Sequence, residues 1–236
     1  MEKLVQEFCD LSGITLNASQ LLALGKYCDE LTLWNAKHNL TAIQEPEQVR
    51  VKHFLDSLSG YLAMRGTSIS RVVDVGTGAG FPGIPLKILC PRIKLTLVDS
   101  KEKKAAFCRH VVKTLKLDNV DVIQSRAEVI GHDIHHREMY DWATARAVAI
   151  LPVLLEYLLP LVKVGGCVLA MKGESAHTEI HSSERAIQLL GGHLRQLLPV
   201  TLPGVVEQRH LIVVDKVAAT PEKYPRRAGI PSKRPL

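Results

Sequence analysis

The sequence predicts an α/β fold in which a mostly parallel sheet carries helices on both faces. From residue 71 onward, short runs rich in β-branched residues alternate with stretches of helical spacing, as in strands joined by crossover helices. The last two strand patterns, 193–200 and 210–216, have no helical pattern between them and are expected to pair antiparallel. Before residue 71 the apolar spacing is helical only, which predicts additional N-terminal helices.

Three apolar patterns predict those N-terminal helices. The first ends near Gly13 and has an apolar face of Leu4, Val5, Phe8 and Leu11. Asn17 and Gln20 form a capping pair before the second, whose apolar face is Leu21, Leu24, Cys28 and Leu31. Pro46 suits a first helical position and precedes a third face of Phe54, Leu55, Leu58 and Leu62.

The strands and crossover helices follow in order along the rest of the chain. Strands are predicted at 71–75, 94–100, 120–124, 141–145, 165–172, 193–200 and 210–216. Helices are predicted at 84–90, up to about residue 115, at 151–162 and at 179–190. With 236 residues and 46% hydrophobic content, one core is expected. We divide the chain into N-terminal helices (1–65), the α/β core (66–220) and a C-terminal tail (221–236).

Several protein classes do not fit this composition. The first ten residues, MEKLVQEFCD, lack the apolar segment of a signal peptide. The most apolar stretch, 147–164, is interrupted by Pro152, Glu156 and Pro160, which argues against a membrane span. Five scattered cysteines without a CxxC pair argue for a reducing compartment and against a zinc or disulfide framework. We expect a cytoplasmic protein, monomeric by default because no long exposed apolar stripe requires a partner.

Positive charge is concentrated in the C-terminal tail. The chain has a net charge of +6, and residues 221–236 hold five Lys and Arg residues against one Glu. Four prolines in the same segment predict an extended conformation without a helix. Two interpretations remain open: a solubilising terminus, or an arm that contacts a polyanion through counterion release.

The most informative segment is the glycine-rich turn DVGTGAGFPG, residues 74–83. It follows the first predicted strand and precedes a helix, at the sheet edge where open α/β folds bind ligands. Glycines there allow a sharp turn and close backbone approach. The next strand ends in Asp99, which is placed to accept hydrogen bonds from two ribose hydroxyls. The turn therefore predicts a cofactor that contains a nucleoside.

The spacing of the turn favours S-adenosylmethionine over a dinucleotide. If the GxGxxG pattern began at Gly76, its third glycine would fall on Phe81, and the alternative frame from Gly78 starts late and includes Pro82. Asp74 would also repel a pyrophosphate, whereas it suits a cationic amino or sulfonium group. An acidic residue followed by x-G-x-G-x-G is a sequence pattern typical of methyltransferases. An enzyme that binds a dinucleotide is the alternative.

The chain lacks two common methyl-acceptor signatures. No Asp/Asn/Ser-Pro-Pro-Tyr/Phe turn follows the fourth strand, where exocyclic-amine enzymes carry one. Cys90, Cys108 and Cys167 have apolar neighbours and are interpreted as buried structural residues, not nucleophiles. The remaining acceptors have an exposed lone pair, such as guanine N7, which needs no general base. No catalytic acid or base is predicted, and Arg146 is a candidate for positioning.

Basic residues are expected along the same sheet edge. They follow the third, fourth and fifth strands or precede the last: Arg126, Arg146, Lys172 and Arg209. A solvated surface charge is the alternative for each. The histidine-rich HDIHH loop at 132–136 lacks the context of a metal site, and no metal is predicted.

These motifs resemble the ribosomal RNA small-subunit methyltransferase G family, also called glucose-inhibited division protein B, nearly end to end. The matching segments are WNAKHNLTAI (34–43), HFLDSL (53–58), DVGTGAGFPGIPL (74–86), VDS (98–100), SRAE (125–128), ARAVA (145–149), MKG (171–173), RHLIV (209–213) and YPRRAGIPSKRPL (224–236). The glycine turn indicates only a methyltransferase, whereas the N-terminal motif and the tail make the match specific.

The resemblance implies a Rossmann-like seven-stranded methyltransferase sheet with N-terminal helices. It implies methyl transfer from S-adenosylmethionine to N7 of one guanine in 16S rRNA, in the loop near the decoding site. Family cofactor contacts fall on Gly76, Phe81, Ala127, Glu128 and Arg146, beside our own candidates Asp74, Gly78 and Asp99. Candidate RNA contacts are Arg126, Lys172, Arg209, Arg226 and Arg227. The alternatives are a small-molecule methyltransferase, a non-catalytic RNA-binding or assembly factor, and a dehydrogenase.

Overall fold

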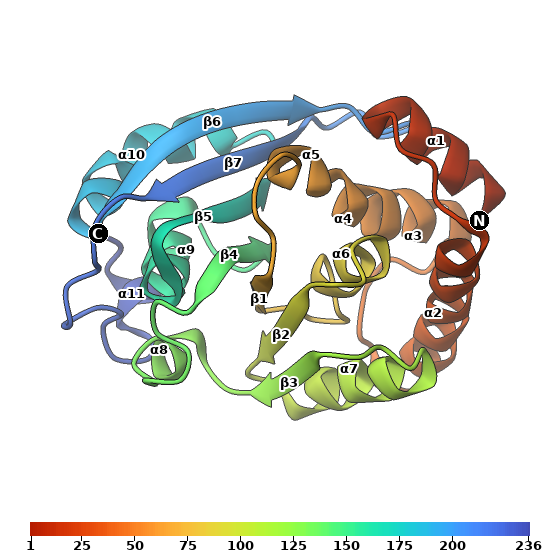
Figure 1. Cartoon of the computed structure of the whole chain (residues 1–236), viewed down its shortest axis with the longest axis horizontal. Helices are drawn as coiled ribbons and strands as arrows, with labels where there is room; N and C mark the ends of the chain where they lie inside the picture. Colours follow the sequence, from red (N-terminus) through yellow and green to blue (C-terminus); the bar gives the residue numbers. More distant parts are fainter.

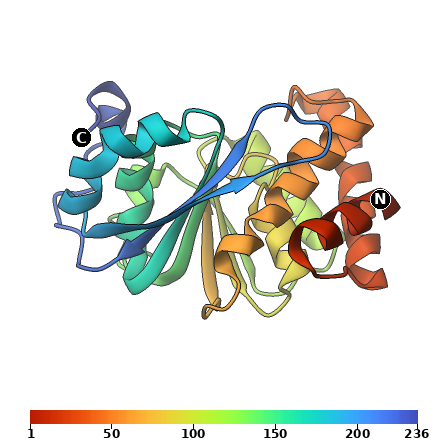
Figure 2. The ribbon, with the colours of Figure 1, turned by 90° about the horizontal axis from the view of Figure 1, so that it is seen from above.

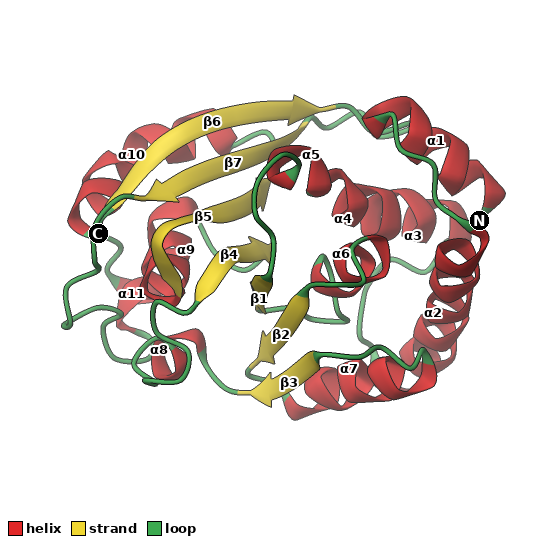
Figure 3. Cartoon of the chain, viewed as in Figure 1, coloured by secondary structure: helices red, strands yellow, loops and turns green.

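Seven strands form one sheet in the order β3-β2-β1-β4-β5-β7-β6 (Figure 3). The computed structural model describes residues 1–236. The strands are β1 (Arg71–Val75), β2 (Lys94–Asp99), β3 (Val120–Gln124), β4 (Tyr140–Arg146), β5 (Val162–Lys172), β6 (Gly192–Val200) and β7 (Arg209–Lys216).

The strand order places a switch point beside β1. The chain moves outward from β1 through β2 to β3 and then returns to pair β4 with the other side of β1, all in parallel. A crevice forms at the carboxyl ends of strands where the order reverses in this way. β7 pairs antiparallel with both β5 and β6, which confirms the prediction made from the missing crossover helix.

Helices cover both faces of this sheet, as the sequence predicts (Figures 1 and 2). The N-terminal helices are α1 (Glu2–Ser12), α2 (Ala18–His38), α3 (Pro46–Val49), the π-helical segment η1 (Arg50–Leu55), α4 (Asp56–Ser59) and α5 (Tyr61–Met64). The crossover and later helices are α6 (Gly83–Leu89), α7 (Glu102–Thr114), α8 (Ala127–Ile130), α9 (Leu151–Leu158), the 3₁₀ turn η2 (Leu159–Leu161), α10 (Ala176–Leu189) and α11 (Ile230–Lys233).

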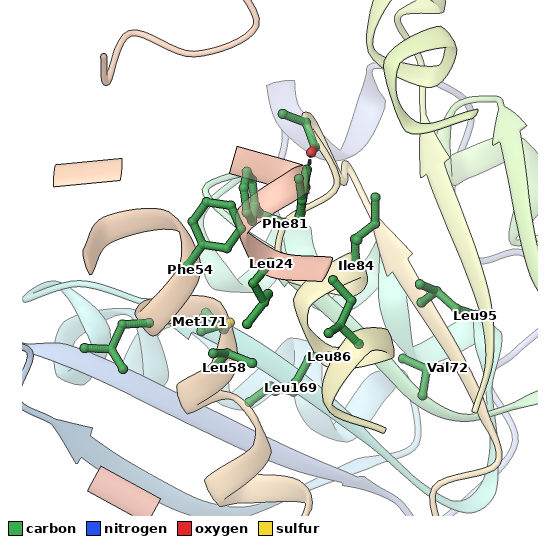
Figure 4. Close-up of a cluster of buried hydrophobic side chains, with 14 of the residues drawn as sticks. Leu24, Phe54, Leu58, Val72, Phe81, Ile84, Leu86, Leu95, Leu169 and Met171 are labelled. Atoms are coloured by element: carbon green, nitrogen blue, oxygen red, sulfur yellow. Dashed lines mark hydrogen bonds between the residues drawn. The ribbon is translucent and has the colours of Figure 1, made fainter. Parts of the chain in front are cut away.

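Alternating side chains of the strands pack into two separate apolar clusters. In β5, Leu169 joins the cluster of the N-terminal helices, α6 and α7, whereas Val168 joins the cluster of α9 and α10. Figure 4 shows the first cluster, to which Leu24 and Phe54 from the N-terminal helices and Leu169 from the sheet all belong. The N-terminal helices therefore share a core with the sheet, which holds them against the edge that carries the glycine turn.

Local sequence signals account for three helix ends in the N-terminal part of the chain. Asn17 and Gln20 form a complete capping box at the start of α2, with each side chain bound to the other's backbone N–H. Gly13 ends α1 in the left-handed conformation at φ 72°, and Pro46 begins α3. These three predictions are confirmed. No helix combines the length and the apolar composition needed to cross a membrane.

The tail contains a short helix where none was predicted. The prediction is wrong at Ile230–Lys233, which forms α11. Gly229 precedes it in the left-handed region at φ 82°. Pro231 lies in the first turn, where a backbone N–H has no helical partner, so the proline removes no helical hydrogen bond there.

Candidate active site

Two adjacent cavities lie at the carboxyl edge of the parallel strands. The larger has a volume of about 420 Å³ and is lined by the glycine turn, the end of β4 and parts of η1, β5 and β7. The smaller has a volume of about 310 Å³ and is lined by the ends of β1 and β2, the start of α8 and part of the tail. Both are lined by Gly76, Lys104 and Ala147, so they form neighbouring compartments of one crevice.

The glycine turn brings the backbone directly under the loop that follows β4. Gly76 adopts φ 68°, and its N–H donates to the Val98 carbonyl at the end of β2. A Cβ on Gly76 would lie 2.5 Å from Cγ2 of Val148, closer than carbon atoms can approach. Glycine is therefore required at this position both by the backbone angle and by the close packing.

Asp74 holds the turn from beneath. Its carboxylate is fully buried, and Oδ2 accepts hydrogen bonds from Thr77 Oγ1 (2.6 Å) and from the Gly83 N–H (2.9 Å). Burial raises the pKa of Asp74 to about 6, although these two hydrogen bonds oppose the shift. Oδ1 has no partner. Asp74 lies outside the lining of either cavity, so its direct contacts are with the turn.

Asp99 and the start of α8 line the smaller cavity. Asp99 Oδ2 accepts from the Gly78 N–H and Oδ1 from the Lys101 N–H, both at 2.9 Å. Each carboxylate oxygen keeps a second acceptor site. Ala127 and Glu128 line the same cavity, but Glu128 Oε1 already accepts from the Gly229 N–H in the tail at 2.9 Å.

Arg146 lies at the end of β4 and links the larger cavity to the N-terminal helices. Its guanidinium forms an ion pair with the buried Asp56 and donates to the carbonyls of Lys52 (3.2 Å) and His53 (3.4 Å) in the π-helical segment. Its Cζ also lies 5.4 Å from the ring centroid of Phe81. A single side chain thus fixes η1 and α4 against the glycine turn.

An aromatic stack lies in this wall of the larger cavity. The His53 ring stacks on Phe81 with centroids 4.8 Å apart, and Tyr27 stacks on Phe81 at 5.1 Å. His53 Nε2 lies 2.9 Å from Thr41 Oγ1. Burial and the nearby Arg146 charge lower the pKa of His53 to about 4, so its ring is neutral at physiological pH.

The four predicted basic residues lie at the carboxyl edge in different environments. Arg146 and Arg209 line the larger cavity, and the buried Nε of Arg209 has no partner. Arg126 is exposed at the smaller cavity. Lys172 Nζ is committed to Glu179 Oε2 and to the Ala149 carbonyl, both at 2.7 Å, so it holds the loop after β4 in place.

The two arginines of the tail also differ from each other. Arg226 is bound to the buried carboxylate of Glu156 in α9, whereas Arg227 is exposed to solvent. In the histidine-rich loop, His132 Nε2 contacts the Pro225 carbonyl at 2.6 Å, and His136 Nδ1 contacts the Tyr140 hydroxyl at 2.6 Å. That loop therefore packs against the tail and β4.

A family profile and full-length relatives match the chain that carries this site. The profile described as rRNA small subunit methyltransferase G matches residues 20–212. The chain belongs to the rRNA small subunit methyltransferase G family. The family's protein from Acetivibrio thermocellus is 46% identical over 236 residues, covering 100% of this chain and 97% of the relative. The one from Roseiflexus castenholzii is 49% identical over 224 residues, covering 95% of each chain.

Solved structures share the fold of this rRNA small subunit methyltransferase G family member. A "SAM dependent methyltransferase" from Aquifex aeolicus aligns with a TM-score of 0.56 at 17% identity, covering 75% of this chain and 96% of that one. A geranyl diphosphate C-methyltransferase from Streptomyces coelicolor aligns with a TM-score of 0.54 at 15% identity, covering 81% and 98%. The Rossmann-like methyltransferase fold expected from the sequence is confirmed.

Several residues that line the crevice in this family member were not predicted from the sequence. His53 and Asp56 lie three residues apart on one helical face, a spacing that could have indicated a shared surface. Lys104 lines both cavities from the start of α7. Tyr157, Gly229 and Ser232 line the smaller cavity, and no local pattern marks them because they meet it through tertiary packing.

Proposed function

We propose that this chain transfers a methyl group from S-adenosylmethionine to N7 of one guanine of 16S rRNA, in the loop near the decoding site. The observation that carries the proposal is the pair of adjoining cavities at the switch point, in a chain of the rRNA small subunit methyltransferase G family. One compartment suits a nucleoside, and the other has room for the methyl donor group and an incoming base.

The smaller cavity has the chemistry that an adenosine moiety requires. Asp99 can accept from ribose hydroxyls with the acceptor sites that Gly78 and Lys101 leave free. Ala127 lines the same cavity, and its backbone is our candidate for hydrogen bonding to the purine edge. Gly76 lines both compartments, and because it has no side chain Val148 can pack against it and close one wall of the crevice. The residues present therefore fit S-adenosylmethionine.

The larger cavity would promote the reaction by orienting the guanine base relative to the methyl group of the cofactor. When bound, S-adenosylmethionine supplies an electrophilic methyl group. Guanine N7 carries no proton, so alignment of its lone pair is sufficient and no general base is needed. The pKa of His53, lowered to about 4, makes its ring a weak base, and the Asp56 carboxylate is held in an ion pair by Arg146. No cysteine lines this cavity, which leaves methylation at a pyrimidine carbon without its nucleophile.

Asp99→Ala is expected to weaken binding of S-adenosylhomocysteine by about 1–3 kcal/mol, the usual effect of losing hydrogen bonds at a paired site. Calorimetry measures the change. Asp118→Ala is the control, since Asp118 is exposed just before β3, at the opposite edge of the sheet. Equal affinity in Asp99→Ala and wild type would remove Asp99 from the ribose site.

RNA binding is expected to depend on exposed arginines near the crevice. Arg227→Ala should reduce the slope of log affinity against log salt by about 0.7 for one lost contact to single-stranded RNA. The matched control is Arg92→Ala, because Arg92 is exposed just before β2, at the opposite edge. The idea fails if filter binding over a salt series gives the same slope for Arg227→Ala as for wild type.

The test of the proposed reaction is methyl transfer to small ribosomal subunits that lack the modification. The subunits are incubated with labelled S-adenosylmethionine, and the RNA is digested to nucleosides and separated beside a 7-methylguanosine standard. Label that migrates with the standard is the expected result. Label only on small metabolites would instead identify a small-molecule methyltransferase, and label on another nucleoside would overturn the N7 assignment.

A further inference from the structure

The C-terminal segment, defined here as residues 226–233, lies against the smaller cavity. Gly229 and Ser232 line this cavity together with Tyr157 of α9. The Tyr157 hydroxyl lies 3.0 Å from Ser232 Oγ, and the Gly229 N–H donates to Glu128 Oε1 at 2.9 Å. The segment is therefore bonded to two elements of the cavity wall.

A buried ion pair anchors the start of this segment. Glu156 is fully buried in α9, and its Oε1 accepts from the Arg226 backbone N–H (2.7 Å) and from Nε (2.9 Å). Its Oε2 accepts from Arg226 Nη2 at 2.6 Å. A buried carboxylate is costly unless it is paired in this way. Because Glu156 directly precedes Tyr157, the ion pair fixes the segment next to the ring that lines the cavity.

A second arginine secures the chain just before the segment. The Arg137 guanidinium donates to the carbonyls of Thr220 (2.7 Å), Tyr224 (2.8 Å) and Pro221 (3.3 Å). Pro225 also packs on Gly131, where a Cβ would lie 2.7 Å from the proline ring. This number of contacts indicates that the tail is packed against the α/β core. A flexible arm that only binds RNA would not require them.

The packing of the C-terminal segment against the smaller cavity also changes which groups there can bind a purine. One acceptor position of Glu128 is occupied by the Gly229 N–H, so fewer are left for an adenine edge. The hydroxyls of Ser232 and Tyr157 lie at the same cavity, and because they share one hydrogen bond the pair keeps one free donor together with free acceptor positions. The segment thus adds hydrogen-bonding groups where the strand ends supply few.

We propose that the C-terminal segment and Tyr157 form the wall of the cofactor site that contacts the purine, and that Arg226 and Glu156 position this wall. The inference rests on the proposed function, since it takes S-adenosylmethionine as the ligand. Arg226 is then a positioning residue for the cofactor, and RNA contacts from the segment fall to its exposed residues Arg227 and Lys233.

Calorimetry with S-adenosylhomocysteine and with adenosine tests this assignment. Arg226→Ala should weaken binding of both ligands about tenfold or more, the scale of one charge-assisted hydrogen bond. Arg226→Lys, which keeps the charge but loses the paired geometry, should recover part of the affinity. Glu222→Ala is the control, because Glu222 is exposed in the tail outside the segment, and it should bind both ligands as wild type does. Ser232→Ala, which breaks no buried ion pair, should weaken adenosine binding even if Arg226→Ala fails to fold.

Limited proteolysis of the full-length wild-type chain gives an independent readout. Trypsin is expected to cut after Arg227, which is exposed. S-adenosylhomocysteine at ten times its Kd should slow this cut by up to about tenfold if the ligand binds only the docked segment. Cleavage after Arg92, just before β2, should keep its rate. Equal cleavage after Arg227 with and without ligand would overturn the inference.

The failure of this inference can be distinguished from that of the proposed function. A wild-type chain that does not bind S-adenosylhomocysteine would overturn both. A wild-type chain that binds it, with unchanged adenosine affinity in Ser232→Ala and a folded Arg226→Ala, would overturn only the assignment of the wall.

Discussion

Replacing Arg146 by Ala is expected to lower methyl transfer by about a hundredfold or more. The substitution removes the side chain that ties η1 and α4 to the glycine turn, so the surfaces around Phe81 and His53 lose their relative position. A misplacement of about 1 Å is sufficient for a rate loss of this size. Single-turnover kinetics at saturating cofactor and RNA measures the effect on the reaction step.

The stability of Arg146→Ala must be measured together with its activity. Loss of Arg146 leaves Asp56 buried and unpaired, which is expected to lower the free energy of unfolding by about 3–5 kcal/mol. Asp56→Asn is the comparison, because it breaks the ion pair and leaves the arginine in place. Both should be assayed below their melting temperatures. Wild-type turnover in a folded Arg146→Ala variant would show that Arg146 has no part in the site.

Gly76→Ala is expected to weaken S-adenosylhomocysteine binding by more than about tenfold. The new Cβ would lie 2.5 Å from Val148 Cγ2, and the left-handed backbone adds about 1–2 kcal/mol for a residue with a Cβ. Either the turn or the loop after β4 must move, and both line the crevice. Calorimetry on Gly76→Ala measures the resulting change in affinity.

Two further variants separate the clash from the backbone strain. Gly204 has the same φ of 68°, and no atom lies within 4 Å of the position that a Cβ would take there. Gly204→Ala therefore shows how much the backbone strain alone lowers the free energy of unfolding. It should leave ligand affinity unchanged. Adding Val148→Ala to Gly76→Ala should restore part of the affinity by removing the clash. If the double variant binds no better than Gly76→Ala, the packing of Val148 on Gly76 does not explain the requirement for glycine.

The sheet and its ligand edge could be predicted from local patterns. Alternating strand and helix signals predict parallel pairing, and the missing helix between β6 and β7 predicts their antiparallel pairing. The antiparallel pairing also brings Arg209 to the edge where β5 ends, since His210 pairs with Lys172 in that register. These features follow from the hydrophobic periodicity of strands and helices, which can be recognised in a single sequence.

The contacts of individual charged side chains could not be predicted in the same way. The sequence presents Arg226 and Arg227 as equivalent neighbours, yet one reaches Glu156, which lies 70 residues away in the chain, and the other is exposed. Lys172 likewise meets Glu179 only because α10 folds back beside the loop after β4. Such pairings depend on tertiary packing, so local patterns do not distinguish a structural cation from one that is free to contact RNA.

Mapping the methylated position tests the central claim most directly. Small subunits lacking the modification are treated with the protein and labelled S-adenosylmethionine, and the RNA is reduced and cleaved with aniline, which breaks the chain at 7-methylguanine. We predict cleavage at a single guanine in the decoding-region loop of 16S rRNA. Label incorporated without any aniline-dependent cleavage, or cleavage at a different guanine, would contradict the proposed reaction or its target.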